Sequence, residues 1–283
     1  MTLYCCAIKR ICNFYALLFL FPLSSYALAI DFDGHESEHQ QDFLFLLEEG
    51  YTQEKGEWQF GLSYQDVSYQ DVSYSGEQNQ KKGTDNVWKF GVEYGFTDRF
   101  QVEFFLPYQK SSWYQGNAKI NASTAGNPEI ELIYQVIQET SVVPVVSIGV
   151  GVEIAASSDK APIRSEEWGY EGFVNASKYL EAWGFLHANL AYGVADKGDE
   201  TELSYGLGFV RPINDSFSAM IEYLVEREQE DVLQGSNSKV LAQFTVGFSY
   251  QSNHGFIAGL AYGQSDNDER LERAFTVKFQ YEF

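Results

Sequence analysis

The chain has 283 residues and a formal net charge of −21, with 40 acidic residues against 19 basic ones. Such an acidic chain is poorly suited to nucleic acid, so we expect no nucleic-acid partner. Its 22 Phe and 19 Tyr residues form an aromatic load that is typical of proteins at membrane interfaces.

Residues 1–29 have the pattern of a secretory signal peptide. Lys9 and Arg10 precede an apolar run at 11–23, and Ala27 and Ala29 provide an Ala-x-Ala cleavage pattern. The alternative is a transmembrane anchor, but the run is shorter than the ~20 residues that a spanning helix needs. All three cysteines lie in this peptide, so we expect a mature chain without disulfides or thiolate metal sites.

Residues 30–56 are acidic and irregular, and we expect them in the periplasm. The short apolar run at 43–47 fits either a helical turn or a segment lying against a barrel mouth. The stretch from His35 to His39 matches the His-Glu-x-x-His zinc pattern. No apolar helix face surrounds it and no third ligand is evident. We therefore expect a solvated tail, with adventitious metal binding as the alternative, and no cofactor.

Residues 57–283 alternate between apolar and polar side chains with a period of two, which predicts β-strands. The last strand is the clearest, because Phe275, Val277, Phe279, Tyr281 and Phe283 share one face. We expect twelve strands, with the weakest pattern in the sixth, at 58–64, 88–96, 102–108, 130–136, 146–154, 168–179, 186–192, 203–209, 217–225, 240–250, 256–262 and 275–283.

The connections between these strands are expected to alternate in length. Short ones lie near Thr97, Glu139, Glu181, Pro212 and Asn253, and mostly longer polar ones near Gln80, Ala118, Asp159, Lys197, Glu230 and Asp268. Short periplasmic turns and longer outer loops are typical of outer-membrane barrels. The even strand count puts both termini in the periplasm, and the last strand must pair with the first to close the barrel.

These patterns predict an all-β fold, a transmembrane antiparallel up-and-down barrel in the outer membrane. A soluble barrel is the alternative, with the apolar face inside. The face opposite the apolar one carries Gly, Ser, Gln and Glu, unlike a soluble exterior, and Tyr residues recur toward strand ends, where membrane girdles lie. In lipid, a closed barrel pairs every backbone amide internally.

If the apolar face contacts lipid, the polar face lines the lumen. We expect the lumen to be narrow and acidic, lined by Lys89, Glu93, Gln101, Glu103, Glu131, Gln135, Glu153, Asn189, Glu222, Gln243, Lys278, Gln280 and Glu282. Glycines at inward positions, among them 206, 208, 247 and 259, would widen it locally. The lumen is then either a cation-tolerant channel for small solutes or is blocked by polar residues that pair with one another.

Two further functional features concern assembly and catalysis. Phe275, Phe279, Tyr281 and Phe283 are expected to be read by the barrel-assembly machinery, while acidic loops face lipopolysaccharide. His187 raises the alternative of a lipid-modifying enzyme that uses a Ser–His pair. The expected His-x-Ser spacing is replaced by His187-Ala-Asn189, so we expect no enzyme.

Three stretches carry a resemblance to a known family: Glu54–Phe60, Glu93–Tyr108 with its Tyr-Gly and Thr-Asp-Arg elements, and Gly126–Leu132. They resemble the putative outer-membrane transporter family that is associated with the meta-cleavage pathway of phenol degradation. The third departs from the family's Gly-x-Gly-Asp opening at Pro128. The resemblance implies a barrel with an uptake role and does not identify a substrate.

The sequence thus predicts an outer-membrane channel or uptake protein for an unidentified small solute, with a signal peptide at 1–29, the acidic segment at 30–56 and the barrel at 57–283. A structural or adhesion barrel with a blocked lumen is the alternative from another functional class.

Overall fold

A computed structural model describes residues 43–71, 82–115, 118–155, 168–195, 200–232, 235–267 and 270–283. The predicted signal peptide and the His35–His39 motif lie outside these ranges. Among the described residues, no helix has the length and hydropathy that crossing a membrane requires.

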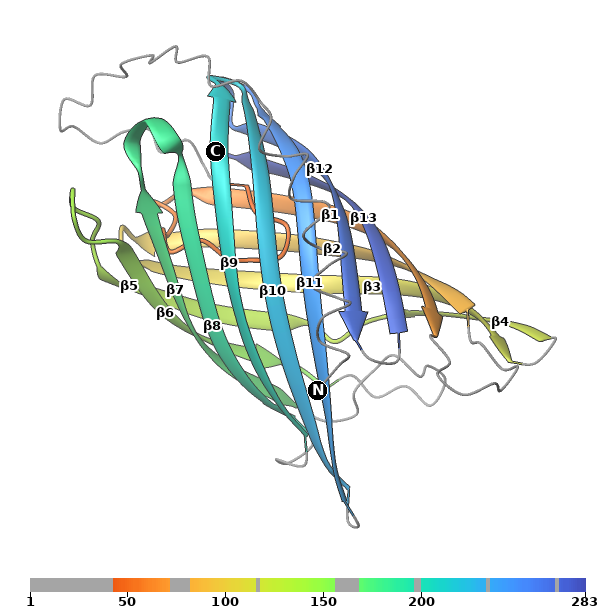
Figure 1. The fold of residues 1–283 in the computed structure, drawn as a ribbon. Coiled ribbons are helices and arrows are strands. Elements are labelled where there is room, and N and C mark those ends of the chain that lie inside the picture. The colour runs from red at the N-terminus through yellow and green to blue at the C-terminus, as the bar shows by residue number, and fades with distance from the viewer. Residues whose placement is uncertain are drawn as a thin grey trace, which may run out of the picture. The chain divides into compact units, whose positions relative to one another are not determined.

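The fold is a closed antiparallel barrel of twelve strands, one of them split into β4 and β5 (Figure 1). The strands are β1 (Trp58–Asp71), β2 (Lys82–Thr97), β3 (Phe100–Gln115), β4 (Ala118–Ala125), β5 (Glu129–Ile137), β6 (Val145–Glu153), β7 (Gly169–Tyr179), β8 (Phe185–Ala195), β9 (Glu200–Asn214), β10 (Phe217–Val232), β11 (Gly235–Gln251), β12 (Phe256–Asn267) and β13 (Arg270–Glu282). A single 3₁₀ turn, η1 (Glu181–Trp183), interrupts the described strands between β7 and β8.

The barrel closes between its last and first strands, as the sequence predicted. β13 pairs with β1 in a register that places Tyr281 opposite Phe60 and Phe279 opposite Leu62. The backbones of Trp58 and Phe283 exchange two hydrogen bonds, of 3.0 and 3.1 Å, at the very end of the seam. Counting β4 and β5 as one, each of the twelve strands therefore has a neighbour on both sides, although β4 itself pairs with β3 alone among the described residues.

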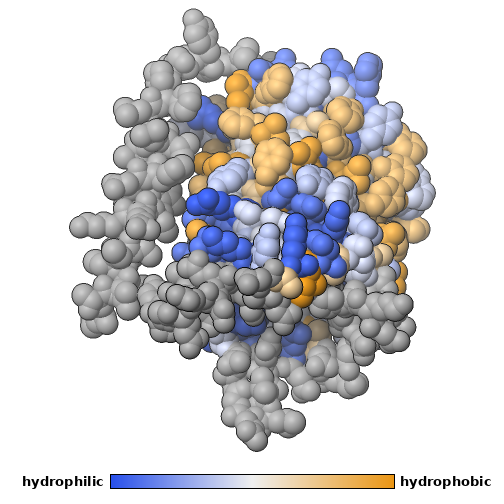
Figure 2. All heavy atoms as spheres, turned by 90° about the vertical axis from the view of Figure 1, so that its right-hand side faces the viewer, coloured by the Kyte–Doolittle hydropathy of each residue, from blue (hydrophilic) through white to orange (hydrophobic). Residues whose placement is uncertain are grey.

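The outer surface is apolar where lipid would contact it. Phe275, Phe279 and Tyr281 on β13 are all more than 40% exposed, as are Leu62 on β1 and Leu260 on β12. Figure 2 shows hydrophobic side chains spread over the face that it presents, bordered by hydrophilic ones. This belt is the exterior of a membrane barrel rather than of a soluble one.

Aromatic side chains gather toward both ends of the strands. Near one end, Tyr64, Trp88 and Tyr108 lie side by side on β1, β2 and β3, with ring centroids 5.0 and 5.8 Å apart. Near the other end, the rings of Trp58 and Tyr94 are 4.5 Å apart. Two aromatic zones flanking an apolar belt are typical of the two membrane interfaces.

The strands are longer than predicted at the end opposite the short turns. The polar stretch around Ala118 was expected to be a long connection, but β3 continues to Gln115 and pairs with β4. Near Glu230 the prediction was also wrong, because β10 and β11 pair as far as Val232 and Gly235. These hairpins extend beyond the apolar belt, so water on both faces removes the alternation that marks the rest of each strand.

Candidate functional site

The predicted lumen residues all lie on the face opposite the exposed apolar belt. Each occupies an inward position of its strand, in register with inward positions of the neighbouring strands. Some are buried almost completely, such as Glu222 at 0% and Glu131 at 3% exposure, while Glu153 is exposed at the end of β6. The interior is therefore filled over part of its height.

Residues 43–56, here named the lumen segment, fill it. In Figure 1 this segment is the orange-red trace between the walls of the barrel. The sequence left open whether Phe43–Leu47 forms a helical turn or lies at the mouth; the structure places it inside, as an irregular turn. The segment leaves the interior where Gly56 donates a 2.7 Å hydrogen bond to the Gly95 carbonyl, directly before β1.

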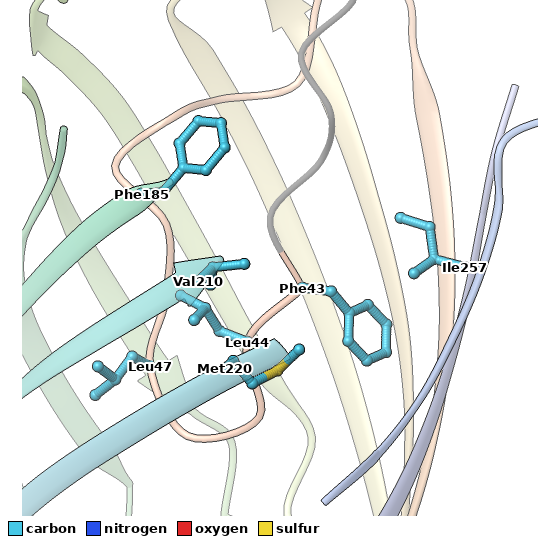
Figure 3. Close-up of a cluster of buried hydrophobic side chains, with 7 residues drawn as sticks. All are labelled: Phe43, Leu44, Leu47, Phe185, Val210, Met220 and Ile257. Carbon is cyan, nitrogen blue, oxygen red and sulfur yellow. The ribbon is translucent and has the colours of Figure 1, made fainter. Parts of the chain in front are cut away.

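One side of the lumen segment is apolar and packs on the wall formed by β8–β12 (Figure 3). The cluster consists of three segment residues and four wall residues: Phe43, Leu44, Leu47, Phe185, Val210, Met220 and Ile257. Burying each of the three segment side chains is worth about 1.5–3 kcal/mol. Hydrophobic burial therefore favours the docked position by several kcal/mol.

Glycines on that wall make the packing possible. A Cβ atom on Gly206 would lie 2.4 Å from Leu47 Cδ2, and one on Gly259 would lie 2.2 Å from the Phe43 ring. Gly247 faces Phe45 in the same way, at 2.8 Å. These inward glycines were expected to widen the lumen, but the side chains of the lumen segment occupy the space that they leave.

Polar contacts fix the segment in place. The Glu222 carboxylate on β10 accepts hydrogen bonds from the backbone N–H groups of Phe45, Leu46 and Leu47, at 2.9–3.2 Å. Lys278 on β13 donates to the Leu44 carbonyl at 3.0 Å. Because both wall residues bind backbone atoms of the segment, these contacts do not depend on the identity of the segment's side chains.

His187 belongs to the same set of anchors. Its Nδ1 lies 2.8 Å from the Ser177 hydroxyl, which also accepts a 2.8 Å hydrogen bond from the Gly50 N–H. Ser177 is on β7, directly opposite His187 on β8. The His-x-Ser pattern considered in the sequence places the serine two residues after the histidine, so it could not identify this pair. Both side chains are at most 1% exposed beneath the segment, and the pair holds Gly50 in place through the Ser177 hydroxyl.

The other side of the lumen segment is polar and contacts β1–β8. Asn175 donates to the Glu48 carboxylate at 2.9 Å, and the Glu48 carbonyl accepts from Asn189 at 2.8 Å. Gln53 donates through its backbone to Gln101 and through its side chain to Gln59. Burial raises the pKa of the Glu48 carboxyl, although the Asn175 hydrogen bond opposes this rise.

Carboxylates on the wall form one continuous row across the strands, here named the carboxylate row. Its members are neighbours in register, with a glycine between them on β6 and on β8: Glu93, Glu103, Glu131, Gly151, Glu171, Gly193, Glu202 and Glu228. The sequence analysis predicted the first three as lumen residues but did not identify Glu171, Glu202 or Glu228. The register shows that all six carboxylates belong together.

The row climbs through the barrel. Glu103 is the fourth residue of β3 and Glu228 the twelfth of β10, both counted from the end with the short turns. With a rise of about 3.3 Å per residue and a tilt of about 40°, the row climbs roughly 20 Å along the axis. It therefore covers most of the height of an apolar belt about 25 Å tall.

Positive charge near the row is scarce among the described inward residues. Lys89 on β2 pairs with Glu129 at 3.5 Å and lies 3.7 Å over the Phe105 ring. Lys278 is already bound to the Leu44 carbonyl. Like charges placed directly opposite each other in a sheet are unfavourable, so the row has a strong tendency to attract cations.

The comparisons with known proteins concern the fold. No family model and no curated protein matches the chain. An outer-membrane channel from Pseudomonas putida F1 has a similar structure, with a TM-score of 0.67 and 14% identity, covering 85% of this chain and 100% of that one. The translocator domain of the autotransporter NalP from Neisseria meningitidis has a TM-score of 0.51 and 12% identity, covering 82% and 90%.

The beta domain of the Bordetella autotransporter BrkA is similar to the same degree, with a TM-score of 0.51 and 12% identity, covering 82% of this chain and 100% of that one. At these identities the likeness concerns the fold, so the resemblance to the phenol-pathway transporter family stays a prediction. The chain therefore has the fold of outer-membrane β-barrels, which supports a location in the outer membrane.

Proposed function

We propose that the protein is a passive outer-membrane channel that admits small cations in preference to anions. The carboxylate row carries this proposal, because it lines the wall for roughly 20 Å along the barrel axis and faces few positive charges. In a narrow, low-dielectric lumen, such a row attracts cations and repels anions.

The lumen segment narrows this route. Gln101, Glu103 and Glu131 are each less than 10% exposed where Glu48 and Gln53 approach them. The lower part of the row is thus covered in the docked position, and the flux depends on how far the segment moves. The same burial favours the second candidate, a structural barrel whose lumen stays blocked.

Conductance of the purified full-length protein in planar bilayers tests the proposal. We expect small, discrete conductance steps and a reversal potential shifted toward that of K⁺ in a KCl gradient. The Glu181→Gln variant is the control, because it removes one exposed charge on the turn after β7 and should behave as the parent does. Silent bilayers would favour the structural barrel, and an anion-selective reversal potential would contradict the proposal.

A further inference from the structure

The middle of the carboxylate row has an unusual spacing. Between β5 and β9 the carboxylates occupy alternate strands, at Glu131, Glu171 and Glu202, with Gly151 and Gly193 on the strands between them. Neighbouring strands lie about 4.8 Å apart, so successive carboxylates are rooted roughly 10 Å apart. The three together span about 19 Å of wall.

The two glycines here differ from those under the lumen segment. A Cβ on Gly151 would have as its nearest neighbours the side chains of Glu131, Glu171 and Glu129, at 3.5–3.9 Å. A Cβ on Gly193 would meet the Glu171 and Glu202 side chains and a backbone oxygen, all at 3.8–3.9 Å. No apolar side chain fills these two places, so the floor between the carboxylates consists of bare backbone.

The row also holds a buried oxygen without a partner. Glu131 is 3% exposed, and its Oε2 atom makes no hydrogen bond. The Glu131 carboxyl group also meets the Glu48 carboxyl, and Glu103 stands directly opposite on β3. An unsatisfied buried oxygen among three carboxyl groups is costly unless a donor or a positive charge reaches it.

The geometry argues against a single metal ion as that charge. Metal–oxygen bonds of about 2.0–2.6 Å require the ligands to converge on one point. Among the described residues, no group of three or more Asp, Glu, His or Cys is close enough to hold a metal ion. The row instead offers acceptors at intervals along a line.

We propose that Glu131, Glu171 and Glu202 form a binding site for a linear organic polyamine, which lies across β5–β9 when Glu48 of the lumen segment has moved away from Glu131. Its ammonium groups donate charge-assisted hydrogen bonds to the carboxylates, and its methylene linkers lie over Gly151 and Gly193. The inference rests on the proposed cation channel and names the class of solute that this channel favours.

Calorimetric titration of the full-length protein in detergent, with spermidine as the probe, tests this site. We expect saturable binding that weakens about tenfold for each carboxylate removed in Glu171→Gln and Glu202→Gln, since each bond to a charged group is lost. Neither residue makes a hydrogen bond to the lumen segment in the structure, so both variants should fold. The Glu181→Gln control should bind spermidine as the parent does.

Butylamine and Mg²⁺ are the matched probes. We expect butylamine, with one charge, and Mg²⁺, with a compact charge, to bind much more weakly than spermidine. Equal binding of Mg²⁺ and spermidine, or unchanged binding in the double variant, would overturn the site. If the protein binds spermidine but does not conduct, the channel proposal is wrong and the binding site stands. If it conducts but does not bind spermidine, the binding site is wrong and the channel proposal stands.

Discussion

The two sides of the barrel interior follow the same alternating pattern and differ in what they do with it. On β8–β12 the inward positions are mainly small or apolar, such as Gly206, Val210 and Ile257, and they hold the lumen segment. On β1–β7 the inward positions carry Glu93, Glu103 and other polar groups. The difference teaches that the apolar wall holds the lumen segment mainly by packing, whereas the polar wall holds it by hydrogen bonds and carries most of the carboxylate row.

The largest effect should come from removing the main anchor of the lumen segment. Glu222→Ala leaves three backbone N–H groups without their acceptor, at a cost of about 1–3 kcal/mol each. We expect the segment to undock and the single-channel conductance to rise several-fold. Arg227→Ala, at an exposed outward position of the same strand, is the control; an equal rise in both variants would contradict the anchoring role.

Filling the space beside one inward glycine should undock the lumen segment to a smaller extent. In Gly206→Ala the new methyl group would clash with Leu47, and overpacking of this kind costs about 1–3 kcal/mol. We expect faster proteolysis of the segment and more frequent opening events. Gly61→Ala on β1 is the control, because its Cβ would have no neighbour closer than 4.0 Å. Equal proteolysis of the two variants would show that the close packing at Gly206 does not hold the segment.

On the acidic side, Glu131→Gln should change selectivity more than docking, because the new amide can still donate a hydrogen bond to the Glu48 carboxyl that meets it. The substitution keeps the shape of the side chain and replaces one carboxyl group of the row by an uncharged amide. We expect the reversal potential in a KCl gradient to move toward zero by a few millivolts, with nearly unchanged conductance, because single-charge effects in a lumen are partly screened. A complete loss of conductance would indicate that Glu131 instead supports the fold.

The smallest effect concerns pH. Because burial raises the pKa of Glu48, the docked segment binds a proton more tightly than the free one. Docking is therefore most stable at acidic pH and weakens as the pH rises above about 4.5, the ordinary value for this group. We expect the conductance to increase modestly with pH. The Glu48→Gln variant keeps the same neighbours, Asn175, Lys89 and Glu131, and should show a smaller change of conductance with pH. An identical slope in both proteins would contradict this.

The period-two pattern predicted the strands because lipid on one side and polar groups on the other impose it directly. The seam between β13 and β1 followed from the same pattern, since Tyr281 and Phe60 share the lipid side. The hairpin of β3 and β4 lacks that constraint and was missed. The assembly role of Phe283 stays a prediction.

The lumen segment could not be placed from sequence, although its signals were present. The apolar run at Phe43–Leu47 was one, and the inward glycines at 206, 208, 247 and 259 were the other. They are separated by more than 150 residues, and only the closed barrel brings them together. The pair of Ser177 and His187 was missed for the same reason, because its partners meet across two strands.

The register of the carboxylate row has a consequence for how the barrel can vary. The row follows the hydrogen-bond direction of tilted strands, so it forms a helical path round the lumen with one inward position on each strand, occupied by a carboxylate or, on β6 and β8, by a glycine. Changing the length of an outer loop leaves the register between strands unchanged, so every residue of the row keeps its position. A register shift of one residue in a strand that carries a carboxylate of the row would turn that carboxylate toward lipid. A shift of two residues would keep the carboxylate inward but move it out of line with its neighbours in the row.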